Sequence, residues 1–375
     1  MSTIFELYGY PIDSWNDEAW ENLKRCNCPF MNAECDGGGN RFASGITLIN
    51  HKELQRYFNG QKKIQTGVCS LSVRNGEPPW IVCPRRLMNF RNHAPDDLQA
   101  SIKNKLYASS MLSKGECYKV WSEIKMKCNV TEGSKNALFD YTFDYIITAC
   151  GSEKLSSICK LLGKSERQTK KILEENGMTI AIRDEELWCD EFPSKPLIIV
   201  EVMTSSTSGG NERNRTQVGQ VFEDTIYKLA GKDVNPEGPG INYRQVWARM
   251  VSQLLVKSQI GAAWNGVTFW VIQDMLANYI TKTTALNLND FLSEAIDEVN
   301  IISGGYGKAI EPSNRDSRLI EISEVKMFSG PVSNNNDSAK AFVDIVKLGC
   351  TPDISELWKR LIEKKPCASF TYKLN

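Results

Sequence analysis

The feature that most constrains this chain is a short apolar run with one acidic residue inside it. Residues 197–203 read LIIVEVM, follow two prolines and precede a polar loop over 204–210. Such a run, rich in β-branched residues and bounded by turn formers, predicts a strand buried on both faces. An ionised Glu201 is costly there, so it must be neutral, paired with a cation, or placed at the end of the strand facing a site.

A second strand-like run, over residues 141–147, also carries one acid, Asp144. If the two strands are neighbours, the carboxylates of Asp144 and Glu201 converge. Two close carboxylates repel each other unless a positive charge lies between them, and Mg²⁺ prefers oxygen ligands. The two runs therefore indicate a magnesium site, although isolated acids near strand ends also occur in many folds without any catalytic role.

Bulk composition narrows the classes of function. The chain has 375 residues, with 45 Lys and Arg against 45 Asp and Glu, so a site for a polyanion must be local. Only two histidines are present, which disfavours mechanisms built on a His base or on His-rich zinc sites. No export signal or membrane-spanning run is evident, and we expect a cytoplasmic protein whose twelve cysteines are thiols.

Four of these cysteines lie in a loop-rich N-terminal region that has little apolar sequence of its own. Cys28, Cys35, Cys69 and Cys83 would suffice for a tetrahedral all-sulfur site holding Fe or Zn. Their spacing lacks the paired CxxC pattern, so a scatter of buried thiols is the alternative. Cys26 could take the place of Cys28.

Helical patterns occur in three places. Apolar spacing predicts a helix within residues 96–127, and an amphipathic helix over 243–259 with Arg244, Arg249 and Lys257 on its polar side. Between residues 150 and 190, one helix ending at Gly163 and a second capped by Ser165 form a basic helix-turn-helix-like pattern. An ordinary helical hairpin with a solvated basic face explains the same pattern.

A strand Asp, followed by a strand with an acid and a third functional group two residues later, is the layout of the PD-(D/E)xK nuclease core. Residues i and i+2 of a strand face the same way, so the side chains of Glu201 and Met203 point into one site. The third position is usually Lys. Met203 can neither donate a proton nor bind Mg²⁺, and Thr204, Gln217 or Gln220 are candidates to supply polarity instead.

With these motifs, the chain resembles the NotI restriction endonuclease family over roughly residues 26–280. The resemblance runs through Cys28-Pro29-Phe30, Gly67-Val68-Cys69, Trp80 to Pro84, Phe143-Asp144-Tyr145, Leu197 to Thr204, and Glu237 to Asn242. It implies that Cys28, Cys35, Cys69 and Cys83 hold a structural Fe or Zn, and that Asp144 and Glu201 hold the catalytic Mg²⁺. This chain differs in having Met203 where the family member carries Gln, and in an insertion over 152–190.

The implied architecture is an α/β PD-(D/E)xK core with a mixed central sheet and a small, loop-rich four-cysteine metal-binding domain. We expect residues 1–95 to form the metal-binding region, 96–149 and 191–285 the endonuclease core, 150–190 an inserted element, and 286–375 a C-terminal elaboration. In the core, Asp144, Glu201 and position 203 would be catalytic. Arg213 and Arg215, with Arg167 and Lys170 of the insertion, are candidates for DNA contacts, since Arg can read guanine and Lys more often holds phosphate.

The implied function is that of a type II restriction endonuclease, a homodimer that cuts double-stranded DNA with Mg²⁺ and leaves 5′-phosphate ends. Its companion in the cell would be a cognate DNA methyltransferase, and no membrane partner is expected. Two other classes stay open: a catalytically weakened DNA-binding protein of the same fold, and a repair or CRISPR-associated nuclease with a cysteine-bound Fe–S cluster.

Overall fold

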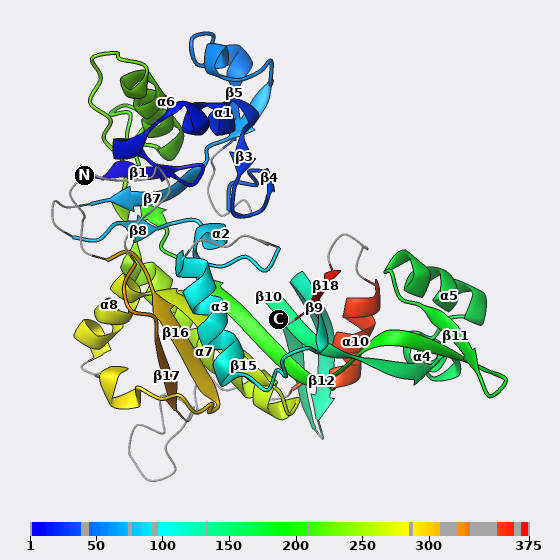
Figure 1. The fold of residues 1–375 in the computed structure, drawn as a ribbon. Coiled ribbons are helices and arrows are strands. Elements are labelled where there is room, and N and C mark those ends of the chain that lie inside the picture. Colours follow the sequence, from blue (N-terminus) through cyan, green and yellow to red (C-terminus); the bar gives the residue numbers. More distant parts are fainter. Residues whose placement is uncertain are drawn as a thin grey trace.

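The computed structural model describes residues 2–38, 45–73, 77–91, 97–132, 134–208, 210–284, 288–307, 322–330, 351–363 and 369–373. A large sheet lies at the centre of the molecule, with strand order β17-β16-β15-β12-β10-β9-β18 and β11 paired to β12 (Figure 1). Its strands are β9 (Cys117–Glu132), β10 (Lys135–Lys154), β11 (Ile180–Arg183), β12 (Glu186–Met203), β15 (Val267–Gln273), β16 (Val299–Gly304), β17 (Lys326–Gly330) and β18 (Ser369–Lys373).

The sheet is mixed, as the sequence predicts. Strand β10 runs antiparallel to both of its neighbours, β9 and β12, whereas β15 runs parallel to β12 and β16 runs parallel to β15. Every residue of β15 is buried, as expected for a parallel strand covered on both faces. The mixed α/β class with a large central sheet is therefore confirmed.

The helix expected within residues 96–127 is shorter than predicted. Helix α3 spans Asp97–Ser109, and β9 begins at Cys117. In β9 the buried Ile124 and Met126 alternate with the exposed Lys125 and Lys127, which is the two-residue period of a strand. The prediction was wrong for this segment because that alternation outweighs the helical spacing of the residues before it.

Helices cover both faces of the sheet. On one face, Leu98, Ile102 and Leu106 of α3 pack against Ile198, Val200 and Val202 of β12. On the other face, α7 (Tyr243–Ala263) and α10 (Ile354–Glu363) pack against Leu197 and Ile199. Because side chains alternate along a strand, Glu201 and Met203 belong to the face covered by α7.

The inserted segment forms a helical hairpin, as predicted. Helix α4 (Leu155–Leu162) ends at Gly163, which has a φ of 62°, and α5 (Glu166–Glu175) begins with a capping box between Ser165 and Gln168. Leu155, Ile158 and Leu173 of the hairpin share a core with Leu357 and Leu361 of α10. The hairpin is thus anchored beside the central sheet, to which β11 is also joined (Figure 1).

The N-terminal region has a second, four-stranded sheet in the order β2-β1-β7-β8 (Figure 1). Its elements are short: β1 (Thr3–Leu7), β2 (Tyr10–Pro11), α1 (Asp17–Arg25), β3 (Asn27–Cys28), β4 (Ala33–Glu34), β5 (Gly45–Thr47), β6 (Lys63–Gln65), β7 (Val68–Ser72), β8 (Trp80–Ile81) and α2 (Pro84–Leu87), with 3-10 turns at Ile12–Ser14, Leu48–Asn50 and Leu54–Tyr57. Helix α6 (Val218–Leu229), from much later in the chain, packs Val221, Phe222 and Ile226 into the same small core.

A buried ion pair joins this region to the central sheet. The Arg86 guanidinium of α2 donates to Glu6 of β1 at 3.0 Å, and the Tyr306 hydroxyl, which follows β16, donates to Glu6 at 2.6 Å. The remaining short elements are β13 (Thr207–Ser208), β14 (Gly240–Ile241), α8 (Asp274–Thr284) and a 3-10 turn at Leu288–Phe291. No helix within the described ranges is long and apolar enough to cross a membrane.

Candidate active site

The two acids predicted to converge lie side by side in the sheet. Tyr145 of β10 is paired with Val200 of β12, which places Asp144 beside Glu201 at the next register position. The backbone N–H of Val202 donates to Asp144 Oδ2 at 2.8 Å, so the Asp144 carboxylate is fixed against β12. The structure therefore brings Asp144 and Glu201 together, at the point where β12 approaches its end.

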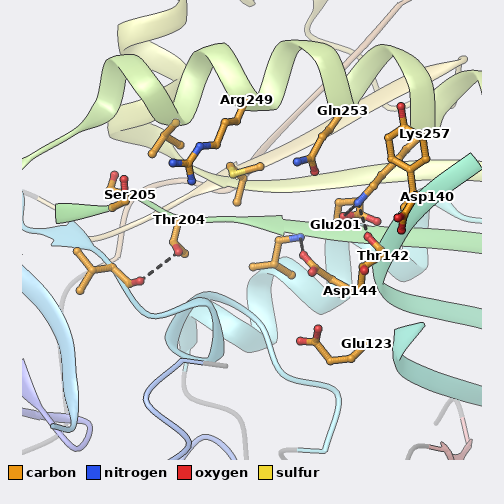
Figure 2. Close-up of a pocket in the computed structure, with 16 residues that line it drawn as sticks. Glu123, Asp140, Thr142, Asp144, Glu201, Thr204, Ser205, Arg249, Gln253 and Lys257 are labelled. Carbon is orange, nitrogen blue, oxygen red and sulfur yellow. Dashed lines mark hydrogen bonds and ion pairs between the residues drawn. The ribbon is translucent and has the colours of Figure 1, made fainter. Parts of the chain in front are cut away.

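Lys257 of α7 completes this group. Its ammonium donates to Glu201 Oε2 at 2.5 Å and to the carbonyl oxygen of Thr142 at 2.7 Å (Figure 2). The side chains of Lys257 and Glu201 are each only 3% exposed, so the pair is almost fully removed from water. An ammonium has three N–H donors, and two of them are used here.

The ion pair with Lys257 does not fully compensate for the burial of the Glu201 carboxylate. Burial raises the pKa of Glu201 to about 8; the Lys257 ammonium opposes the rise, and the negative charge of Asp144 adds to it. Glu201 Oε1 is buried and has no hydrogen-bond partner within the described part of the chain. A buried carboxylate oxygen without a partner is costly, and a further positive charge at this position would offset that cost.

The prediction that Lys257 lies on the polar side of its helix was wrong. Lys257 follows Val246 and Met250 by eleven and seven residues, which brings it round to the face that packs on the sheet. Both Val246 and Met250 are buried in that face. The spacing of Lys257 from Val246 and Met250 therefore predicts that it lies on the buried face of α7. The prediction of an exposed Lys257 followed its charge and not this spacing.

These residues line a cavity of about 580 Å³ between the end of β12 and helix α7 (Figure 2). Glu123, Asp140, Thr142, Asp144, Glu201 and Lys257 lie toward one end of it, Thr204, Ser205 and Arg249 toward the other, and Gln253 between Arg249 and Lys257. Glu123 pairs with Arg85 at 3.4 Å, and Asp140 pairs with Lys127 at 3.4 Å. Glu123, Asp140, Arg249 and Gln253 had not been predicted as site residues.

Met203 also lines the cavity, as its position two residues after Glu201 predicts. Its side chain is only partly buried and packs against the buried cluster that includes Val246, Met250 and Trp270. Of the three residues considered as polar replacements for it, Thr204 lines the cavity, whereas Gln217 and Gln220 are not among the lining residues. Instead of position 203, helix α7 supplies a cation, Lys257, which pairs with Glu201.

The two acids suit a hard divalent cation such as Mg²⁺. Both Asp144 and Glu201 offer carboxylate oxygens on one wall of an open cavity, and one of these oxygens is buried without a partner. Within the described residues, however, no three or more Cys, His, Asp and Glu side chains already form a ligand set for a metal ion. Two carboxylates are nevertheless a usual protein contribution for Mg²⁺, which keeps several waters.

The cysteines predicted to bind Fe or Zn gather in the N-terminal region. Cys28 and Cys69 pack in one cluster with Phe30, and Cys35 packs against it. Burial raises the pKa of all four thiols, that of Cys83 to about 11, and a charge on Cys83 would further raise the pKa of Cys28, Cys35 and Cys69. These thiols have the donor chemistry for a soft metal, but they do not form a completed ligand set.

Cys26 lies in a different environment from the other four. Its thiol donates to Gln61 Oε1 at 3.1 Å, and it is buried in the core formed with α6. The choice between Cys26 and Cys28 therefore favours Cys28.

The residues predicted to contact DNA lie apart from the cavity. Arg215 pairs with Glu223 at 3.1 Å and with Asp224 at 2.7 Å, both on α6, so its guanidinium is already engaged by the protein. Arg213 is exposed in the loop before α6. Arg167 is exposed on α5, where Lys170 pairs with Glu166 at 2.8 Å. Their contacts with DNA stay a prediction.

Comparisons with known proteins do not narrow the function further. No protein-family model, no curated protein and no solved structure matches this chain.

Proposed function

We propose that this protein is a type II restriction endonuclease with a PD-(D/E)xK core, which hydrolyses double-stranded DNA with Mg²⁺ and leaves 5′-phosphate ends. The proposal includes a homodimer acting on a palindromic site, a structural Fe or Zn on the four cysteines, and a cognate methyltransferase that protects the cell's DNA. The observation that carries it is the convergence of Asp144, Glu201 and Lys257 in one open cavity.

The order of elements around the cavity supports the same proposal. Helix α3 is followed by strands β9, β10 and β12, with the inserted hairpin between β10 and β12, and then, after α6, by α7 and the parallel strand β15. In the layout expected of the nuclease core, one strand carries an Asp and a following strand carries the second acid. Asp144 of β10 and Glu201 of β12 occupy those places.

Lys257 is the residue that we propose as the third catalytic group. It comes from α7 rather than from the strand, and it reaches the acids that Met203 cannot serve. Its ammonium is held by Glu201 and by the carbonyl of Thr142, which leaves one N–H to orient a water molecule or to stabilise charge developing on a phosphate oxygen.

The acids have a different role from the lysine. Mg²⁺ bound by Asp144 and Glu201 would polarise the scissile phosphate and lower the pKa of an attacking water. The backbone N–H of Val202 holds Asp144 in place for this role. Burial of Glu201 among Phe143, Trp270 and Lys257 excludes water from one side of the site and strengthens electrostatic interactions within it.

The direct test is to incubate the purified protein with Mg²⁺ and a sequenced phage genome and to map the fragment ends. Discrete ends with 5′-phosphates are expected. Asp144→Asn keeps an oxygen that can accept from Val202 N–H but removes the charge, so cleavage should be lost while DNA binding is kept. Asp190→Ala, on the same strand as Glu201 but paired with Arg183 away from the cavity, should cut normally.

The outcomes separate the rival classes. Cleavage by Asp144→Asn at the wild-type rate would show that Asp144 is not a catalytic residue. Binding to discrete sites without cleavage by the wild-type protein would instead support the catalytically weakened DNA-binding protein.

A further inference from the structure

The cavity has two ends of opposite chemical character. The four acids among its lining residues, Glu123, Asp140, Asp144 and Glu201, lie toward the end that holds Lys257, whereas Arg249 and Ser205 lie toward the other (Figure 2). The first end suits a cation. The second offers hydroxyl groups and the positive charge of Arg249, which suits an anion.

Arg249 is placed to face this second end. It stands four residues before Gln253 and eight before Lys257, so all three project from one side of α7 into the cavity (Figure 2). Lys257 is held by Glu201, but no carboxylate pairs with Arg249 among the described residues. Its guanidinium is therefore available to an anionic ligand, and guanidinium binds phosphate through two parallel hydrogen bonds.

Ser205 provides an independent sign of a ligand at the same end. Its side chain is only 2% exposed, it lines the cavity, and its Oγ has no hydrogen-bond partner within the described part of the chain. The backbone N–H of Ser205 donates to the carbonyl of Ile81, and the neighbouring Thr204 hydroxyl donates to the carbonyl of Val82. Ser205 is thus fixed in position with an unused hydroxyl beside the Arg249 end, where a buried polar group should have a partner.

We propose that Arg249, assisted by Ser205, binds a second, non-scissile phosphate of the DNA strand that is cut. This rests on the proposed function, because it takes Asp144, Glu201 and Lys257 as the place of the scissile phosphate. Eight residues of helix separate Arg249 from Lys257 by about 12 Å along α7. Successive nucleotides of one strand rise about 3.4 Å along the duplex axis, so the cavity is longer than one nucleotide step. The contact fixes the register of the strand over the acids.

The first test measures binding of a short fluorescent duplex across a range of salt concentrations in buffer without Mg²⁺. Each phosphate contact contributes about 0.9 to the slope of log affinity against log salt. Arg249→Ala should reduce that slope by about one and weaken binding about tenfold. Arg249→Lys should keep the slope. Arg244→Ala removes an exposed arginine from the same helix outside the cavity, and it should change neither quantity.

The second test locates the phosphate. Once the cut position is mapped, duplexes with one uncharged methylphosphonate at each position near the cut are compared as substrates. The wild-type protein should lose activity at one non-scissile position to which Arg249→Ala is no longer sensitive. Ser205→Ala should reduce binding at this position by a smaller factor than Arg249→Ala.

Failure of this inference is distinguishable from failure of the proposed function. Normal cleavage by the wild type, with Arg249→Ala indistinguishable from Arg244→Ala in slope and in methylphosphonate sensitivity, overturns the inference and leaves the function. A changed cut sequence in Arg249→Lys also overturns it, because Arg249 would then read a base. An Arg249-dependent salt slope without cleavage supports the phosphate contact and overturns the nuclease. No binding and no cleavage overturns both.

Discussion

The buried ion pair of Glu201 and Lys257 contributes little net stability to the fold, and its importance is that it positions two charged groups at the cavity. Removing two charges from water is expensive, and the attraction between them repays that cost only partly unless other hydrogen bonds help. Lys257 has such help from the carbonyl of Thr142, whereas Glu201 keeps one oxygen without a partner in the described residues. Glu201 lines the cavity, so a bound cation there can supply the missing partner of its carboxylate.

Lys257→Met should therefore destabilise the fold and abolish cleavage. Methionine fills a similar volume but leaves the Glu201 carboxylate buried without a counter-charge, and breaking a buried pair in this way costs about 3–5 kcal/mol. The measurement is the free energy of unfolding from urea titrations in the absence of Mg²⁺. The matched double variant Glu201→Gln with Lys257→Met removes both charges and should recover much of the loss. Equal stability of the wild type and Lys257→Met would contradict the buried pair.

A second substitution separates the catalytic role of Lys257 from its structural one. Met203 faces the same side of β12 as Glu201 and lines the cavity, so Met203→Lys in the Lys257→Met background returns an amine to the site. Part of the cleavage activity should return with it, measured as the rate on a single mapped DNA site. A stable double variant without any activity would argue against Lys257 as the third catalytic group.

At the residue scale, the sequence predicted correctly that Asp144 and Glu201 converge, but it did not predict that Lys257 is buried beside them. Asp144 and Glu201 were found because each is a single charge inside a strongly patterned strand, and patterned strands predict their neighbours well. Lys257 was missed because it sits within an otherwise apolar helix face, where its partner comes from a strand more than fifty residues away. Only tertiary packing shows that such a lysine is buried and paired.

At the scale of elements, the distance between α7 and the sheet determines where Lys257 is held. Gly261, one turn after Lys257, faces Thr268 of β15, and a Cβ at this position would lie 2.4 Å from Thr268 Oγ1. The same Thr268 hydroxyl donates to the carbonyl of Lys257 at 3.1 Å. A glycine here therefore allows the helix to approach the strand closely enough for Lys257 to reach Glu201.

Gly261→Ala should push α7 away from β15 and lower activity more than a comparable substitution elsewhere in the helix. Overpacking of a buried contact costs about 1–3 kcal/mol, and the displacement would move the lysine from its partner. Thermal unfolding and the cleavage rate measure the two effects. Combining Gly261→Ala with Thr268→Ala removes the clashing oxygen and should restore part of both; if it restores neither, the close approach is not what places Lys257.

The elements themselves were predictable to different degrees. The strands of the apolar runs, the amphipathic helix and the inserted hairpin were evident from period and caps, since Gly163 and Ser165 are strong local signals. The segment after Ser109 was not, because its helical spacing ended where an alternating strand began. The packing of α6 with the N-terminal core could not be read from sequence, since it joins residues far apart in the chain.

At the scale of the whole molecule, the four-cysteine region and the candidate active site are physically connected. Arg86 of α2, three residues after Cys83, binds Glu6 of β1, which also accepts from Tyr306 beside the central sheet. Residues 81 and 82, next to Cys83, accept hydrogen bonds from Ser205 and Thr204 at the end of β12. These hydrogen bonds link the cysteine region directly to the loop after β12, which lines one end of the cavity.

This connection makes the metal content of the cysteine region a test of the whole arrangement. The N-terminal elements are short and share one small apolar core, and a structural metal adds stability to small regions of this kind. Cys69→Ser should therefore lose a bound Fe or Zn, which we expect at about one per chain, and should be less soluble, with lower cleavage activity. Elemental analysis of the purified protein, with visible absorbance and acid-labile sulfide, measures the metal and distinguishes a single ion from an Fe–S cluster.

Cys26→Ser is the matched control, because the Cys26 thiol donates to Gln61 and lies outside the group of four. It should keep its metal, its solubility and its activity. If Cys69→Ser folds well and cuts DNA without metal, the cysteines are ordinary buried thiols and the region is held by its apolar core alone. If Cys26→Ser loses metal while Cys28→Ser keeps it, the ligand set includes Cys26 in place of Cys28, and the loop from Cys26 to Cys35 must rearrange when metal binds.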